Sequence, residues 1–550
     1  MDAADAHVRQ PWSDTPMGVE EQTELVVALV APIGTDVAMI CGELEKALDE
    51  YGFTTHTLRL SDYLPELAPS AAGLAALTKK RLDEFLYEAM DAGNALRQRW
   101  SPGDVLALRA IVDIAEIRKA KTKAMVGDSD EKWPLNLERH AFILRSLKTP
   151  DELATLRGIY GDRLIVIGAY SPESLRIEHL AQQIEDSRTK KDRTTWVYQP
   201  EDLIDRDTHE AQTGGQSVTK TFHRADFFMK AWDRIVAAKD IERILRVVFG
   251  DPYVTPTIDE FAQFMAAGSA RRSAELGRQV GAAIVDECSV VALGANEVPR
   301  FGGGSCWDGE SPDNREHAHA RANGGVETNR AEQERIAQEM AGEISGHFDS
   351  ALKTAGIKHH ASRGKLRRAL EKDLESRLLD GGLAAITEFG RAVHAEMDAL
   401  LDAARRGVPV TGCTIYTTTF PCHNCARHIV GAGITRVVFV EPYAKSKAGD
   451  LHGDSIVIDE PSTSGAVSFE PFVGVAPRRY LSFFSAEARE ELAHQPRKTK
   501  NHRVRDFVKS QAIPLFVDLE PVDLRLLLPA YRARELLAIT RFKQLTEPSP

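Results

Sequence analysis

Two hydrophobic patterns alternate along the first 235 residues of the chain. Short apolar runs such as Leu25–Val30 have the length of buried strands, and segments such as residues 36–53 carry apolar side chains at helical spacing. A strand, a tight loop, a helix and another strand form a βαβ unit, which implies a parallel sheet. Residues 21–235 are therefore predicted to form one doubly wound α/β domain, behind a polar, disordered tail at residues 1–20.

A second α/β pattern occupies residues 236–490. A predicted helix at residues 256–277 precedes two predicted strands, and further helices and strands follow from residue 390 onward. Residues 305–385, approximately, are charged and mostly helical in pattern, and we interpret them as an insertion. The order predicts a second α/β domain interrupted by a helical insertion, with residues 491–550 as a C-terminal extension.

Composition limits the classes of function. The formal net charge of −12 disfavours general affinity for nucleic acid. No apolar run is long enough to span a membrane, and the N-terminus has no apolar signal region, so a cytoplasmic location is expected. Six cysteines in 550 residues do not make a disulfide scaffold. A Cys-x-x-Cys pair in such a chain is therefore expected to be a metal or redox pair.

The chemistry is concentrated in "AVHAEMDALL" and "TTFPCHNCARHIV". His394, Cys422 and Cys425 offer one imidazole and two thiolates, which suit Zn²⁺, and three protein ligands leave the fourth position open as in catalytic sites. Pro421 is predicted in the first turn of a helix that carries both cysteines. Glu396, two residues beyond the histidine, is predicted to transfer protons without binding the metal.

Each half of this pattern has an ordinary explanation. A lone Cys-x-x-Cys pair could belong to a structural zinc site or a redox centre, and a lone His-x-Glu carries no information. Together, His-x-Glu on one helix and Pro-Cys-x-x-Cys on the next form the signature of zinc-dependent base deaminases. The combination therefore favours a catalytic zinc.

The region from about residue 255 to 460 resembles the CMP/dCMP deaminase family, in the zinc motifs and in "RQVGAAIVDECSVVALGANEVP". The resemblance implies a cytidine-deaminase-like α/β/α sandwich in which Asn296 contacts the sugar. Arg278 is a candidate for the nucleotide pocket, or alternatively a solvated arginine at a helix end. Beyond "VFVEPYAKSK", Lys445 and Lys447 are candidates for phosphate contacts and Tyr443 for stacking on the base, although exposed loop charges and ordinary packing explain them equally well.

Three further segments are "SLKTPDELATLRGIYGDRLIVIGAY", "VEPYAKSKAGDLHGDSI" and "FEPFVGVAPRRY". With them, residues 21 to about 490 resemble the bacterial anti-phage dCTP deaminases, two-domain enzymes with an N-terminal P-loop kinase-like domain. This resemblance implies deamination of dCTP to dUTP, and of dCMP to dUMP, as an antiviral defence that depletes dCTP. It also implies a homo-oligomer, in that family a hexamer, and restraint of some members by a small inhibitory RNA.

The N-terminal loop "APIGTDVA" departs from a working P-loop. Asp36, Val37 and Ala38 stand where a kinase needs Gly, Lys and Ser or Thr, so phosphoryl transfer is not expected. Backbone N–H groups around Gly34 and Thr35 could still bind a nucleotide.

Two alternative functions remain open. A polynucleotide cytidine deaminase would need a basic groove with aromatic platforms, which the acidic net charge disfavours. A regulatory protein that senses a nucleotide or RNA through its N-terminal domain belongs to a different class, and could coexist with deamination.

Overall fold

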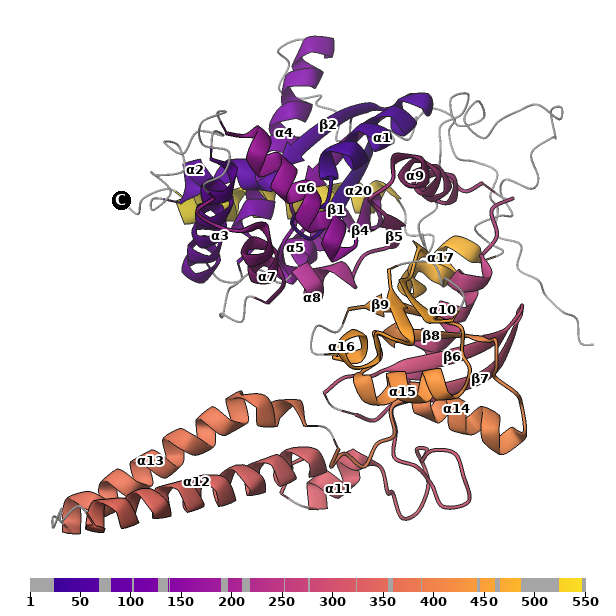
Figure 1. The fold of residues 1–550 in the computed structure, drawn as a ribbon. Helices are drawn as coiled ribbons and strands as arrows, with labels where there is room; N and C mark the ends of the chain where they lie inside the picture. Colours follow the sequence, from indigo (N-terminus) through magenta and orange to yellow (C-terminus); the bar gives the residue numbers. More distant parts are fainter. Residues whose placement is uncertain are drawn as a thin grey trace, which may run out of the picture. The chain divides into compact units, whose positions relative to one another are not determined.

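The computed structural model divides the chain into two compact units (Figure 1). Unit 1 comprises residues 1–255 and 481–550, and unit 2 comprises residues 256–480. The structure describes residues 24–68, 81–100, 103–126, 137, 139–188, 196–209, 218–251, 253–275, 277–322, 324–354, 360–386, 388–442, 446–459, 465–485 and 524–546. The predicted tail at residues 1–20 lies outside these ranges.

Unit 1 is built on a parallel sheet with connecting helices. Its strands are β1 (Glu24–Val30), β2 (Thr54–Arg59), β3 (His140–Arg145), β4 (Leu164–Tyr170) and β5 (Phe227–Lys230). They lie in the order β5-β4-β1-β3-β2, and each neighbouring pair is parallel. β1 is buried along its whole length because strands flank it on both sides, which explains its unbroken apolar run.

The helices of unit 1 follow the predicted alternation. They are α1 (Val37–Glu50), η1 (Leu60–Tyr63), α2 (Leu64–Leu67), α3 (Leu82–Arg99), α4 (Val105–Val126), α5 (Pro150–Tyr160), η3 (Gly161–Arg163), α6 (Glu173–Asp186), α7 (Pro200–His209), α8 (Val218–Phe222), α9 (Arg234–Val248) and α20 (Leu524–Thr546). α5 begins with a capping box, in which the Thr149 side chain accepts from the Glu152 N–H and the Glu152 side chain accepts from the Thr149 N–H, and Pro150 takes the first helical position.

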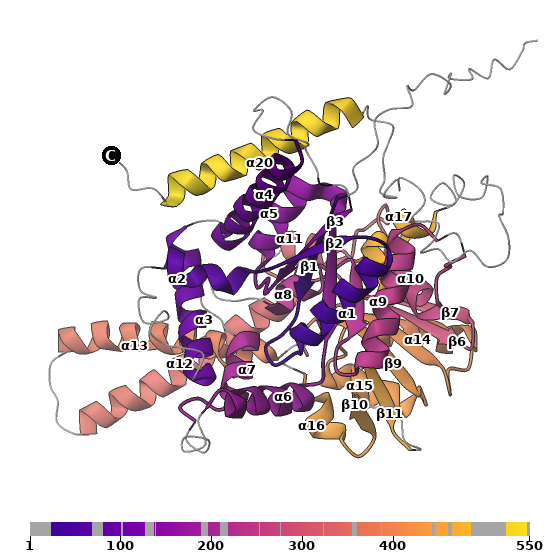
Figure 2. The same ribbon diagram turned by 90° about the horizontal axis from the view of Figure 1, so that it is seen from above.

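The C-terminal helix belongs to unit 1. Figure 2 shows α20 running alongside α4. Arg118 of α4 donates to the carboxylate of Glu535 over 2.6 and 2.7 Å, and to Glu24 of β1 over 2.6 to 3.1 Å. This buried charge cluster fixes the end of the chain against the first strand of the unit.

The division between the units differs from the predicted one near residue 236. That position lies inside α9, which packs against α1 and buries apolar residues including Ile241 and Leu245. The helix completes the core of unit 1, and the chain passes to unit 2 between Thr255 and Pro256. Residue patterning alone does not show on which sheet such a helix packs.

Unit 2 is a mixed sheet between helices. The strands of this sheet are β6 (Gly281–Asp286), β7 (Ser289–Ala295), β8 (Thr414–Thr419), β9 (Arg436–Glu441), β10 (Ile456–Ile458) and β11 (Val467–Pro471), and the two-residue strand β12 (Gly474–Val475) lies outside it. The order β10-β11-β9-β8-β6-β7 is antiparallel at β7-β6-β8 and parallel from β8 to β10.

Two glycines allow helices to approach this sheet closely. A Cβ atom on Gly281 would lie 2.0 Å from the carbonyl oxygen of Ala266 in α10 (Ile258–Ala270), and one on Gly294 would lie 2.1 Å from that of Ala395 in α14 (Ala395–Arg406). Ala282 pairs with Gly294, so Gly281 and Gly294 face opposite sides of the sheet. α10 and α14 therefore cover opposite faces, as Figure 1 shows, and form the predicted α/β/α sandwich.

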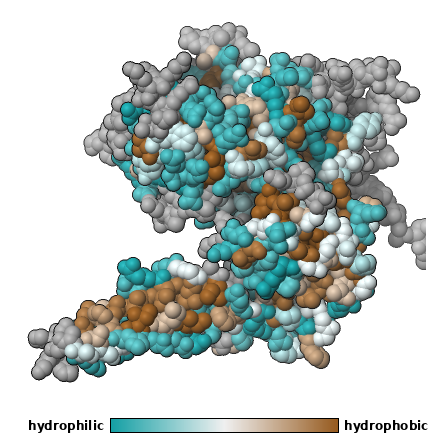
Figure 3. All heavy atoms as spheres, in the orientation of Figure 1, coloured by the Kyte–Doolittle hydropathy of each residue, from teal (hydrophilic) through white to brown (hydrophobic). Residues whose placement is uncertain are grey.

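The predicted insertion contains a helical hairpin. The remaining helical elements of unit 2 are α11 (Glu316–Ala322), α12 (Thr328–Thr354), α13 (His360–Asp380), η4 (Gly382–Ala385), α15 (His423–Gly431), α16 (Ala448–His452) and η5 (Pro477–Arg479), and α17 (Tyr480–Phe484) begins at the boundary between the units. Figure 3 shows a hydrophobic face along α12 and α13, where Met340, Ile344, Phe348 and Leu366 are exposed. Among the helices of the described ranges, none is both long and apolar enough to cross a membrane.

Candidate metal centre

His394 is positioned by the start of α14. It is the N-cap residue of that helix, and its carbonyl oxygen accepts a hydrogen bond from the Asp398 N–H. The preceding residue, Val393, forms an isolated bridge with Glu297, just beyond β7. Because α14 packs closely against the sheet at Gly294, the imidazole of His394 has a fixed position relative to the sheet.

The two cysteines are positioned by the start of α15. Cys422 is the N-cap residue, and Cys425 lies in the first turn and is buried. The prediction that Pro421 occupies the first helical turn was wrong. Cys422 has an extended backbone, so the helix begins at His423 and Pro421 precedes the cap. Both sulfur atoms still lie at the helix N-terminus, where the backbone dipole favours thiolates.

The three side chains converge on one point. His394 Nδ1 lies 3.3 Å from Cys422 Sγ and 3.4 Å from Cys425 Sγ. All three donor atoms lie within 4.8 Å of one another. Tetrahedral zinc with bonds of about 2.3 Å to sulfur and 2.0 Å to nitrogen separates such donors by about 3.5 Å. The spacing and the donor chemistry both fit zinc, as the sequence predicted.

Hydrogen bonding among these groups sets their charge before a metal binds. The Cys425 thiol and then the His394 ring lower the pKa of Cys422 to about 3. The hydrogen bond to Cys422 raises the pKa of His394 to about 9. The hydrogen bond with Cys422, together with burial, raises the pKa of Cys425. A metal ion that takes these donors must displace the remaining protons, so its binding is expected to be pH-dependent.

Glu396 lies beside this set without belonging to it. It sits in the first turn of α14 and is only 4% exposed. Burial raises the pKa of its carboxyl group, while the neighbouring His394 acts in the opposite direction. A buried carboxyl group that can hold or release a proton next to a metal is a suitable general acid and base.

The structure brings Asn296 and Arg278 together. The Asn296 amide donates to the Arg278 carbonyl oxygen over 2.7 Å and accepts from the Val280 N–H over 2.7 Å. The Arg278 guanidinium is 48% exposed and pairs with Glu441, at the end of β9, over 3.1 Å. The Asn296 amide therefore holds the backbone just before β6. The predicted contacts of Asn296 and Arg278 with a nucleotide stay predictions.

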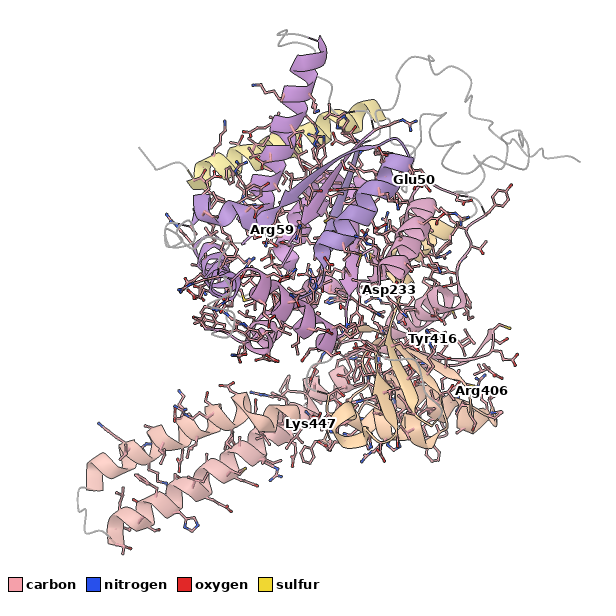
Figure 4. All side chains as sticks on the ribbon, turned by 45° about the horizontal axis from the view of Figure 1, so that its top comes forward. Glu50, Arg59, Asp233, Arg406, Tyr416 and Lys447 are labelled. Carbon is pink, nitrogen blue, oxygen red and sulfur yellow. The ribbon has the colours of Figure 1, made fainter. Side chains whose placement is uncertain are left out.

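Tyr443 and Lys445 lie outside the described residues, whereas Lys447 precedes α16 and is exposed (Figure 4). The Ser446 hydroxyl donates to the Pro421 carbonyl oxygen over 2.8 Å. This bond ties the chain just before Lys447 to the loop that carries the metal ligands. A role for Lys447 in phosphate binding remains a prediction.

One titratable residue near the centre was not foreseen. Burial, followed by the charges of Glu327, Glu316 and Glu297, raises the pKa of Glu275 to about 7. These carboxylates come from the start of the insertion and from the end of β7. No local pattern in the sequence marks Glu275, because its environment arises only when these segments fold together.

The loop around Gly34 in unit 1 differs from a phosphate-binding loop. Asp36 caps α1 by accepting the Met39 N–H over 2.9 Å, so a carboxylate occupies the helix N-terminus. Gly34 has φ of +85°, and a Cβ atom there would lie 2.5 Å from the Arg176 carbonyl oxygen. The glycine thus permits close packing against α6, and nucleotide binding by Gly34 and Thr35 stays a prediction.

Comparison with known proteins supports the assignment of the metal centre. Residues 256–441 match the family described as "Cytidine and deoxycytidylate deaminase zinc-binding region". The deoxycytidylate deaminase of Enterobacteria phage T2 is 46% identical over 57 residues, which are 10% of this chain and 30% of that protein. ComE operon protein 2 of Bacillus subtilis (strain 168) is 41% identical over 64 residues, 12% of this chain and 34% of that protein.

The chain thus spans about a third of the length of these curated relatives. A solved structure, dCMP deaminase from the cyanophage S-TIM5 in complex with dCMP and dUMP, is 17% identical, with a TM-score of 0.21. It covers 40% of this chain and 99% of that one. The family match and the convergent His394, Cys422 and Cys425 donors identify a zinc-binding deaminase domain in unit 2.

Proposed function

We propose that this domain deaminates deoxycytidine nucleotides by hydrolysis, converting dCMP to dUMP and dCTP to dUTP. The observation that carries the proposal is the buried Glu396 carboxyl group next to a His–Cys–Cys donor set. A structural zinc site needs no such acid beside its ligands. The matches to deoxycytidylate deaminases support the choice of substrate.

When bound, zinc supplies the Lewis acidity that activates water for attack on C4 of the cytosine ring. His394, Cys422 and Cys425 would hold it. In the overall reaction a C4–O bond forms and the C4–N bond breaks. One proton from water goes to ring N3, and the other leaves with the amino group as ammonia. Glu396 is placed to carry both protons, since its burial stabilises the protonated form between transfers.

The physiological part of the proposal rests on the resemblance to anti-phage dCTP deaminases. We expect the protein to act in the cytoplasm as a homo-oligomer, to be restrained by a small RNA, and to deplete dCTP during infection. The measurement is the dCTP pool of cells expressing the protein, before and after infection. An unchanged dCTP pool after infection, with active enzyme present, would overturn this role.

Incubation of the zinc-loaded protein with dCMP, dCTP and single-stranded oligodeoxycytidine tests the enzymatic part. We expect uracil nucleotides from dCMP or dCTP and none from the oligonucleotide. Turnover of the oligonucleotide alone would instead indicate a polynucleotide deaminase. Both mononucleotides should compete with each other, since one pocket is expected to bind them.

A further inference from the structure

Unit 1 contains a cavity of about 190 Å³ at the carboxyl ends of its parallel strands. The loop after β1, the last residues of β2 and β3, and one side of α3 line it. In open α/β sheets ligands bind at these ends, where the strand order reverses. In the order β5-β4-β1-β3-β2, the direction of the chain connections reverses beside β1, between the loops that follow β1 and β3.

Two of the four cations that line this cavity already have counter-charges. Arg97 Nη2 lies 3.3 Å from the buried Glu152 carboxylate. Lys148 Nζ lies 3.0 Å from Asp207, which also accepts the Ile33 N–H over 2.8 Å. These pairs are satisfied by the protein itself, so they do not require a ligand.

The other two cations, Arg59 and Arg145, face each other. They are the last residues of β2 and β3 and are direct partners in the register of that strand pair. Arg59 Nε is 3.7 Å from the exposed Asp62, beyond hydrogen-bonding distance, and within the described residues Arg145 forms no hydrogen bond or ion pair. Like charges directly opposite on adjacent strands destabilise a sheet unless an anion lies between them.

The electrostatic setting of Arg59 agrees with this geometry. Burial lowers the pKa of its guanidinium, the charge of Asp62 acts against this, and the charge of Arg145 lowers the pKa further. Guanidinium groups match phosphate oxygens in a bidentate arrangement, so two of them compensate one phosphate dianion. Figure 4 marks Arg59 in unit 1.

Thr35 provides an independent indication of a ligand. Its side chain lines the cavity and is 7% exposed, yet its hydroxyl group has no hydrogen-bond partner within the described part of the chain. A buried hydroxyl without a partner is destabilising by itself. A phosphate oxygen in the cavity would satisfy it.

The part of the cavity lining that comes from α3 is apolar. Successive turns of α3 present Leu82, Phe85, Leu86 and Met90 to it. The Phe85 ring is half-buried and suits contact with a flat base. The cavity therefore combines a cationic end with an aromatic and aliphatic side, which matches one phosphate joined to a nucleoside.

We propose that this cavity binds a nucleoside monophosphate, with its phosphate between Arg59, Arg145 and Thr35 and its base against Phe85. Arg145, and Arg59 with only the exposed Asp62 at 3.7 Å, match one phosphate, whereas a triphosphate would bring charge that the satisfied pairs cannot balance. Asp36 at the start of α1 and the absence of a P-loop lysine leave a binding site without phosphoryl transfer.

Calorimetric titration of the full-length, zinc-loaded protein with dAMP, dTMP, dCMP and inorganic phosphate tests this proposal, with the matching nucleosides as controls. We expect a saturable site for at least one monophosphate and none for its nucleoside. Arg145→Gln and Arg59→Gln should each weaken it about 10-fold or more, the scale of one charge-assisted hydrogen bond. Arg234→Gln, which changes a 71% exposed arginine of the same unit, should leave it unchanged.

Unliganded stability supplies a second readout, because a purely structural arginine would behave differently. Arg145→Gln should raise the midpoint of thermal unfolding by removing like-charge repulsion. Thr35→Val should raise or preserve it while weakening nucleotide binding. Unchanged affinity in both arginine variants, or a lower midpoint in Arg145→Gln and Thr35→Val, would overturn the proposal. So would an oligoribonucleotide that binds through Arg145 when no monophosphate does.

The result of this titration does not depend on whether the zinc centre is active. Nucleotide held near Cys422 and Cys425 should be insensitive to Arg145→Gln, so the two sites separate in the titration. A protein that fails to deaminate dCMP could still bind a monophosphate in unit 1, and the reverse also holds.

Discussion

The metal centre of unit 2 and the cavity of unit 1 both gather charged side chains beside a sheet, but they balance charge in opposite ways. At the metal centre, the Cys422 thiolate lies at a helix N-terminus next to His394, so opposite charges compensate. In the cavity, Arg59 and Arg145 are adjacent, and the carboxylate nearest to Arg59, that of Asp62, is exposed and 3.7 Å away. The metal centre is therefore suited to bind a cation and to catalyse a reaction, and the cavity is suited to bind an anion without catalysis.

The strongest test of this contrast removes a metal ligand. Cys425→Ala should lose zinc and all deaminase activity, because two remaining ligands cannot hold the ion in its catalytic geometry. Metal content by mass spectrometry and turnover of dCMP measure the two effects. Cys288→Ala, at an exposed cysteine of the same unit, serves as the control and should retain both. Full zinc content in Cys425→Ala would show that the ligand set is wrong.

Removing the acid should separate binding from chemistry. Glu396→Ala should keep one zinc per chain and the fold, because Glu396 lies outside the ligand set. We expect kcat to fall by about 10²–10⁴-fold, the usual contribution of general acid–base catalysis. Asp402→Asn, at a partly exposed carboxylate of the same helix, is the matched control. Near-normal turnover in Glu396→Ala would assign the proton transfer to another group.

A glycine substitution in unit 1 should affect stability and leave the metal centre intact. In Gly34→Ala the new Cβ atom would lie 2.5 Å from the Arg176 carbonyl oxygen at a φ of +85°. We expect a loss of about 2–3 kcal/mol in the free energy of unfolding. Gly42→Ala, in the open interior of α1, should instead gain about 0.5–1 kcal/mol. Equal stability of the two variants in denaturant titrations would contradict the packing assigned to Gly34.

The smallest expected effect concerns Glu275. Its folded-state pKa of about 7 exceeds the ordinary 4.5, so between these values the folded protein binds more protons than the unfolded one. Stability attributable to this residue should therefore fall as the pH rises from about 4.5 to 7. Glu275→Gln should be more stable than the wild type above pH 7 by about 1 kcal/mol after solvent screening, and equal to it below about pH 4.5.

Denaturant titrations at several pH values measure this difference. A constant gap between Glu275→Gln and the wild type across the pH range would show that Glu275 titrates normally. Performing the series on the Cys425→Ala protein as well would show whether the effect depends on the metal centre.

The metal centre was predictable because its parts are local. His394 and Glu396 begin one helix, and Cys422 and Cys425 begin another, so spacing alone identifies them. The capped start of α5 at Thr149 was predictable for the same reason. Short-range backbone geometry decides all of these positions.

The cavity was not predictable in this way. Arg59 and Arg145 each end an apparent strand, but their pairing depends on the strand order and register of the sheet. The helix start at His423 depended on the extended backbone of Cys422 rather than on the residue types around Pro421. A cation at the carboxyl end of each predicted parallel strand is the one signal that could have indicated the cavity.

The most direct test of the account is the reaction of the zinc-loaded protein with dCMP and dCTP in oxygen-18 water, analysed by mass spectrometry. Hydrolytic deamination predicts uracil nucleotides that carry one heavy oxygen on the ring, with an equal amount of ammonia. The rate of product formation should be about 10²–10⁴-fold lower in a parallel Glu396→Ala reaction. Unchanged cytosine nucleotides in the wild-type reaction, with zinc bound at His394, Cys422 and Cys425, would contradict the proposed function.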